Sequence, residues 1–129
     1  LPKFTGTSAT HFADGCSKLS ALDILGGGTI HEYAFQDDTK LSTIIIRSNT
    51  VTKLSFLDCL SRTQFDSGKT GGTLYVPQAQ IENYKAATNW STILSYTKSD
   101  GETLQNQILP IEGSIYETQY ADGTPISTE

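Results

Sequence analysis

The chain has 129 residues, of which 36% are hydrophobic and 18% charged, and its formal net charge is −5 at pH 7. This length and composition fit one compact domain and exclude a disordered polar tract. The acidic balance excludes a broad basic surface, so nucleic acid is not an expected partner. The longest apolar runs, such as residues 44–46, are far shorter than the roughly 20 residues of a membrane span, so membrane insertion is not expected either.

The first signal along the chain is an internal repeat of aliphatic residues with the spacing L-x-x-L-x-L. The two clearest copies consist of Leu19, Leu22 and Ile24, and of Leu41, Ile44 and Ile46. They are offset by roughly 22 residues, a length typical of stacked repeats. A looser third copy ends at Leu74 and Val76, and its surplus residues lie in the glycine- and serine-rich stretch 67–72.

This spacing predicts a short strand at the end of each copy, with alternate side chains pointing into the core. Stacked copies would place these strands side by side in a parallel sheet, and the residues between the core positions would then form two outward columns. The columns are Ala21, Thr43 and Thr73, and Asp23, Ile45 and Tyr75. On the return path between strands, the expected core contacts are Ile30, Val51 and Leu54.

After Pro77 the spacing becomes helical, because Ile81, Tyr84 and Ala87 share one face of a helix over residues 78–88. Asn89 is the expected stop. Together with the apolar residues of 90–94, this helix would cover the last layer of the core, although an ordinary surface helix remains an alternative. Farther on, residues 108–111 and 115–116 predict one or two edge strands, and the stretch from residue 117 is expected to be loose.

Residues 30–35 (IHEYAF), followed by residues 41–46 (LSTIII), resemble the BspA-type (Treponema pallidum-type) leucine-rich repeat. The pattern of that family is I-G-x-x-A-F-x-x-C-x-x-L-x-x-I-x-I-P. In this copy His31 replaces the glycine, Asp38 the cysteine and Arg47 the proline. The first copy keeps the cysteine at Cys16 and the third keeps the proline at Pro77.

The resemblance implies an α/β leucine-rich-repeat solenoid, right-handed and strand-rich, with short parallel strands and one C-terminal capping helix. Residues 1–11 would be the end of a preceding repeat or a linker, since the chain lacks methionine and looks like a trimmed segment. Residues 12–77 would form about three repeats, the third degenerate. Residues 78–95 would be a cap that is similar to the terminal segment of such arrays, and residues 96–129 an extension.

Proteins of this family are secreted, surface-attached or phage-associated, and they bind host proteins or other cells. The resemblance therefore implies a non-catalytic module, extracellular or on a bacterial cell surface, with a protein or cell-surface ligand. Two alternatives stay open: a structural spacer in a surface or virion protein, and an accessory domain of a larger enzyme.

The candidate binding residues lie on the expected open face of the sheet, where an exposed aliphatic residue would stand beside an exposed aromatic one. They are Asp23, Thr43, Ile45, Thr73 and Tyr75. The alternative is that the C-terminal segment around residues 108–115 folds over this face and buries it.

The sequence nominates no catalytic residue, cofactor or metal. Gly68-Lys69-Thr70 lacks the upstream glycine of a phosphate-binding loop, since that position is Thr63. The histidines, His11 and His31, are expected on the surface.

Two further groups of residues have structural interpretations. Asp37 and Asp38, with Glu32 nearby, are interpreted as a solvated turn rather than a calcium or acid–base site. Cys16 and Cys59 would lie about two coils, or roughly 10 Å, apart, which is too far for a disulfide, so both thiols are expected to be buried and unlinked.

Overall fold

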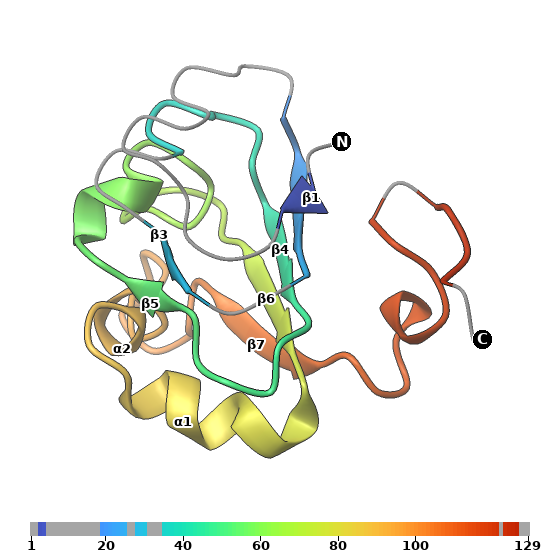
Figure 1. Cartoon of the computed structure of the whole chain (residues 1–129). Coiled ribbons are helices and arrows are strands. Elements are labelled where there is room, and N and C mark those ends of the chain that lie inside the picture. Colours follow the sequence, from blue (N-terminus) through green and yellow to red (C-terminus); the bar gives the residue numbers. More distant parts are fainter. Residues whose placement is uncertain (1–2, 5–18, 26–27, 31–34, 122, 127–129) are drawn as a thin grey trace.

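The computed structural model describes residues 3–4, 19–25, 28–30, 35–121 and 123–126. The described chain forms an α/β fold with parallel sheets and short helices (Figure 1). The main sheet has the strand order β1-β2-β4-β6-β7, and every neighbouring pair is parallel. Its strands are β1 (Lys3–Phe4), β2 (Ala21–Ile24), β4 (Thr43–Ile46), β6 (Thr73–Val76) and β7 (Gln107–Pro110).

The register of the central strands is the one that the repeat alignment predicts. Leu22 pairs with Ile44, and Ile44 pairs with Leu74. The side chains of these three residues are fully buried, since each occupies the inward position of its strand. The prediction of stacked parallel strands is therefore confirmed for all three copies, and β1 extends the sheet on the other side of β2.

A second, two-stranded parallel sheet consists of β3 (Thr29–Ile30) and β5 (Lys53–Leu54). Ile30 and Leu54 are buried as predicted, and Val51 is partly buried against the same core. The sheet itself was not predicted, because a strand of two residues is too short to leave a periodic pattern.

The helices are short. They are the 3₁₀ helices η1 (Leu57–Leu60), η2 (Gln78–Gln80) and η3 (Ile115–Glu117) and the α-helices α1 (Ile81–Ala86) and α2 (Trp90–Ile93). None of the helices in the described ranges has the length and apolar character required to cross a bilayer.

The predicted single helix over residues 78–88 is wrong in its extent, because the chain turns between α1 and α2. Ala87 is extended, and Asn89 has a φ of 69°, a left-handed conformation that asparagine tolerates. The Asn89 side chain donates to the carbonyl oxygen of Leu54 at 2.6 Å. This turn brings Trp90 into the core, where its indole N–H donates to the carbonyl oxygen of Thr52 at 2.8 Å.

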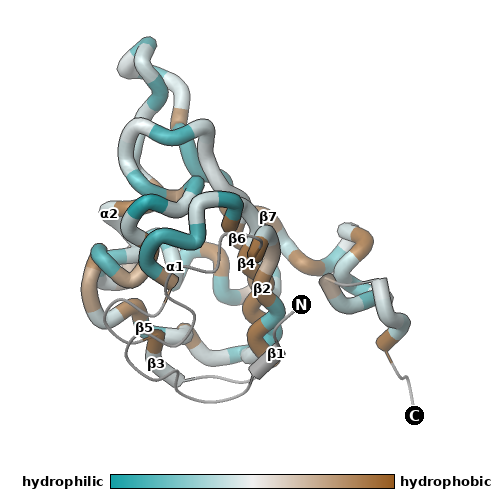
Figure 2. Tube along the Cα trace, turned by 90° about the horizontal axis from the view of Figure 1, so that it is seen from above, coloured by the Kyte–Doolittle hydropathy of each residue, from teal (hydrophilic) through white to brown (hydrophobic). Residues whose placement is uncertain are grey.

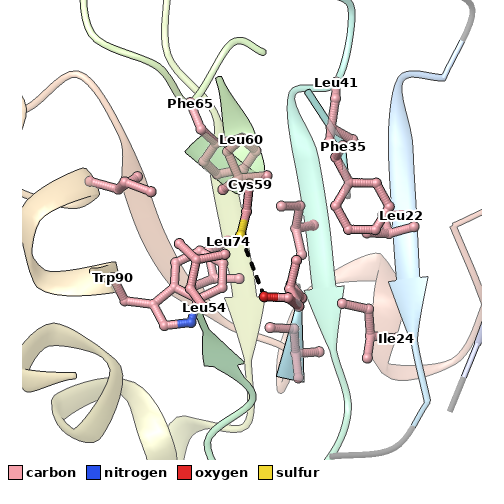
Figure 3. Close-up of a cluster of buried hydrophobic side chains, with 14 of the residues drawn as sticks. Leu22, Ile24, Phe35, Leu41, Leu54, Cys59, Leu60, Phe65, Leu74 and Trp90 are labelled. Carbon is pink, nitrogen blue, oxygen red and sulfur yellow. Dashed lines mark hydrogen bonds between the residues drawn. The ribbon is translucent and has the colours of Figure 1, made fainter. Parts of the chain in front are cut away.

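The core lies between the main sheet on one side and the β3–β5 sheet with α2 on the other (Figure 3). Cys59 is buried in it, and its sulfur donates to the carbonyl oxygen of Ile30 at 3.4 Å. Burial raises the pKa of the Cys59 thiol, which keeps it protonated and unreactive at neutral pH. Cys16 lies outside the described residues, so the absence of a Cys16–Cys59 bond stays a prediction.

The edge strand predicted over residues 108–111 is present as β7, shifted by one residue to 107–110, whereas residues 115–116 lie in η3 and not in a strand. After β7 the chain crosses to the face of the main sheet that is turned away from α1 and α2 (Figures 1 and 2). We call this the outer face, and we call residues 112–121 and 123–126, which lie there, the C-terminal lobe. Hydrogen bonds join the lobe to Asp23 of β2 and to Arg47, which follows β4. The expectation of a loose stretch from residue 117 stays a prediction.

Candidate functional site

The structure brings the predicted binding residues together on the outer face. Asp23 pairs with Ile45, and Ile45 with Tyr75, in one row across the strands. Thr43 and Thr73 stand next to each other in the second row. The strand β7 adds one residue to each row, and these are Leu109 beside Tyr75 and Gln107 beside Thr73. The sequence pattern did not identify these two, because β7 has no counterpart among the repeats.

The predicted exposure of this face is wrong for two of the five residues. Asp23 and Ile45 are 0% exposed, while Thr43, Thr73 and Tyr75 are half-buried. The alternative, in which the C-terminal segment folds over the face, is the one observed. The covering residues are those of the C-terminal lobe, which begins a few residues later than predicted, since residues 107–110 belong to the sheet.

A buried ion pair lies at the centre of this covered face. Asp23 is on β2, and Arg47 directly follows β4, the next strand of the sheet. The Arg47 Nε lies 2.7 Å from Asp23 Oδ1, and its Nη2 lies 2.9 Å from Oδ2. The Asp23 side chain is 0% exposed and the Arg47 side chain 14% exposed. Such a two-point contact between guanidinium and carboxylate offsets much of the cost of removing both charges from water.

The remaining polar atoms of this pair bind the main chain of the lobe. Arg47 Nη1 donates to the carbonyl oxygen of Tyr116 at 2.6 Å, and Nη2 donates to that of Gln119 at 3.1 Å. The backbone N–H of Ala121 donates to Asp23 Oδ2 at 2.9 Å. Asp23 and Arg47 therefore act together as an acceptor and a donor for peptide groups, whatever side chains those groups carry.

Two aromatic contacts complete the cover. The rings of Tyr75 and Tyr116 meet edge to face with their centroids 4.8 Å apart. The ring of Tyr120 lies 5.1 Å from the Arg47 guanidinium carbon, a distance typical of a cation–π contact. Burial, followed by the neighbouring Tyr75 and Asp23, raises the pKa of Tyr116, so its hydroxyl is neutral at physiological pH.

Sequence reasoning missed Arg47 as a site residue. The available signal was its departure from the repeat pattern: a charged residue takes the expected proline position, one strand away from an acidic outward residue. Tyr116 and Tyr120 carried no such signal, because their distance in sequence from the sheet residues they contact leaves no pattern.

The described residues hold no group of three side chains suited to a metal ion. The interpretation of Asp37 and Asp38 as a solvated turn is wrong for Asp38, which is fully buried. Asp37 pairs with Arg62 at the surface, with 3.0 Å between Oδ1 and Nη1. Glu32, His11 and His31 lie outside the described residues.

Known proteins offer no identification. No protein-family model, no curated protein and no solved structure matches this chain significantly.

Proposed function

We propose that this chain is a non-catalytic leucine-rich-repeat module that binds a protein ligand, within a secreted or surface-attached bacterial protein. The repeat assignment is supported by the agreement between the copies in the sequence and the strand register. In a right-handed solenoid each coil contributes one strand, and each strand pairs with the strand of the next coil. The order β1-β2-β4-β6-β7, in which each strand lies beside the next one of the same sheet along the chain, fits that arrangement.

The observation that carries the binding proposal is that the outer face already holds a peptide segment. Asp23 and Arg47 bind three main-chain groups of the lobe, and Tyr75 contacts an aromatic ring from it. Aromatic residues and arginine are the side chains most enriched at the centres of protein interfaces. The net charge of −5 favours a protein ligand over nucleic acid or an anionic membrane.

The test is to pan a random-peptide display library on the immobilised full chain and on two variants. Tyr75→Ser alters the outer face, and Phe56→Ser removes an aromatic residue that is 54% exposed away from that face. We expect related peptides to be enriched on the wild type and on Phe56→Ser, and enrichment to fall at least about tenfold on Tyr75→Ser, since a hot-spot aromatic contributes at least about 1.4 kcal/mol. Enrichment of no peptide, or equal enrichment on Tyr75→Ser, would contradict the proposal and favour a structural spacer.

A further inference from the structure

We propose that the ligand of the outer face is a protein segment with two aromatic side chains at positions i and i+4, and that the C-terminal lobe occupies this site as an internal competitor. The inference rests on the proposed function and specifies both its ligand and its regulation. Four features of the lobe carry it: what it contacts, how its aromatic residues are spaced, how it holds itself together and how little of it is buried.

The contacts of the lobe are those that a separate peptide could make. Its polar contacts with Asp23 and Arg47 use backbone groups of Tyr116, Gln119 and Ala121, which every peptide offers. Nothing in these three bonds requires the bound segment to be covalently joined to the sheet. Extended segments that bind a protein through main-chain groups commonly gain their specificity from a few side chains.

The specificity elements here are the two tyrosines of the lobe. Tyr116 lies against Tyr75, and Tyr120, four positions later, lies over the Arg47 guanidinium. Tyr75 lies in the sheet and Arg47 directly follows one of its strands, so the distance between these two residues sets the spacing of aromatic rings that a ligand must match. Phenylalanine or tryptophan could make either contact as well, because each contact depends on the aromatic ring and not on the tyrosine hydroxyl.

The lobe is also a self-contained unit. Its own backbone bonds include Tyr120 N–H to the Thr124 carbonyl at 2.8 Å and Ile126 N–H to the Thr118 carbonyl at 3.0 Å. An antiparallel bridge joins Gln119 to Pro125. Because these bonds lie within the lobe, it can leave the sheet without losing them.

Little apolar surface holds the lobe in place. None of its described residues is buried, and Ile115 is 63% exposed. The connection to β7 runs through Gly113, which has a φ of 87° and open space around it. Segments with few buried contacts open locally at a small fraction of the free energy of global unfolding.

When the lobe leaves the sheet, the outer face keeps the groups that can bind a replacement ligand. Asp23 and Arg47 would remain paired and would gain water, so no buried charge would be left alone. Ile45 and Tyr75 would lose their cover, and a new segment with suitable aromatic rings would bury them again. With an internal competitor, the apparent affinity for the ligand equals the intrinsic affinity multiplied by the fraction of molecules in which the lobe is open.

The experiment uses the full chain and, as its probe, a fluorescein-labelled peptide with the sequence of residues 112–126. The release variant Tyr116→Ala/Ala121→Pro lacks one ring and the N–H that binds Asp23. In fluorescence anisotropy we expect the peptide to bind this variant at least about tenfold more tightly than the wild type. The matched control Ile115→Ala, which alters an exposed residue of the lobe, should keep the wild-type affinity.

A second peptide, with both tyrosines replaced by alanine, should bind the release variant at least about tenfold more weakly than the first. Equal affinity of the two peptides, or equal affinity of the wild type and the release variant, would overturn the inference. The substitutions lie outside the core, and Trp90 fluorescence checks that the core is intact. Should the double variant unfold, Ala121→Pro alone provides the same comparison.

The two proposals can fail separately. Peptides enriched from the library without the i, i+4 aromatic pair would keep the proposed function and overturn this inference. Binding of the lobe peptide together with an empty library would leave the lobe as a ligand of the face and overturn the role in binding other proteins.

Discussion

At the scale of single residues, the described part of the chain includes two arginine–aspartate pairs in contrasting environments. Arg47 and Asp23 form a two-point contact under the lobe, with exposed fractions of 14% and 0%. Arg62 and Asp37 form a one-point contact, with exposed fractions of 68% and 37%. Water screens the second pair and not the first, so the two should differ in what their loss costs.

We expect Arg47→Met to lower the free energy of unfolding by more than about 1 kcal/mol, because Asp23 would lose its partner under the lobe, and the loss is limited by the free energy that opens the lobe and lets water reach Asp23. Arg62→Met should change it by less than about 1 kcal/mol, as for other exposed pairs. Urea denaturation of the three proteins measures both values. A similar decrease in the free energy of unfolding for the two variants would show that the buried Arg47–Asp23 pair stabilises the fold no more than the exposed Arg62–Asp37 pair does.

At the scale of elements, Tyr84 is the buried residue by which α1 enters the core, and Ile81 packs against the core beside it. Tyr84 is 0% exposed, and its hydroxyl accepts a hydrogen bond from the backbone N–H of Thr52 at 2.8 Å. Its ring meets Trp90 of α2 edge to face, with 5.8 Å between centroids. The sequence predicted Tyr84 as a core position but not its hydrogen bond, since Thr52 lies in a loop without a periodic pattern.

Burial raises the pKa of Tyr84, which makes stability depend on pH in the alkaline range. The folded state holds this proton more tightly than the unfolded chain, so the stabilisation is complete below the unfolded pKa of about 10 and is lost as pH rises toward the folded value. We expect the urea midpoint to fall above about pH 10. Tyr84→Phe should lower the midpoint at pH 7, because Thr52 N–H loses its acceptor, and should flatten this alkaline decline. An equally steep decline in the variant would argue against Tyr84 as its source.

The third repeat copy shows what an element-level pattern omits. Its surplus residues, in the stretch 67–72, include Gly72, where a Cβ would lie 2.6 Å from the ring of Phe65. The N–H of Gly72 also donates to the buried side chain of Asn106, which in turn donates to the carbonyl oxygens of Phe65 and Ile93. The insertion is thus packed against the core and is bound to a residue far along the chain.

At the scale of the whole molecule, the fold combines a stacked core with a lobe that is attached at its outer face. The core is continuous from β2 to α2, whereas the lobe contributes no described buried residue. These two parts should therefore open with different free energies.

Native-state hydrogen exchange measures this difference directly. We expect the amides of the lobe, such as those of Tyr120 and Ile126, to exchange at least about 100-fold faster than the amides of β4 and β6, after correction for intrinsic rates. Strand amides should exchange only through global unfolding. Equal protection of lobe and strands would mean that the lobe is part of the cooperative core, and would weaken the case for its displacement.

The sequence by itself determined the local half of this structure: the short strands, their parallel register, the inward aliphatic residues and the two outward columns. It could do so because each of these follows from a period of two within a strand and from the repeat between strands. Only the tertiary structure decided that Asp23 and Ile45 are covered and that Arg47 binds the lobe. Each of those contacts joins a residue in or next to a strand to a residue of the lobe that lies 69 to 98 positions farther along the chain. The lobe is outside the repeats, so no periodic pattern predicts these contacts.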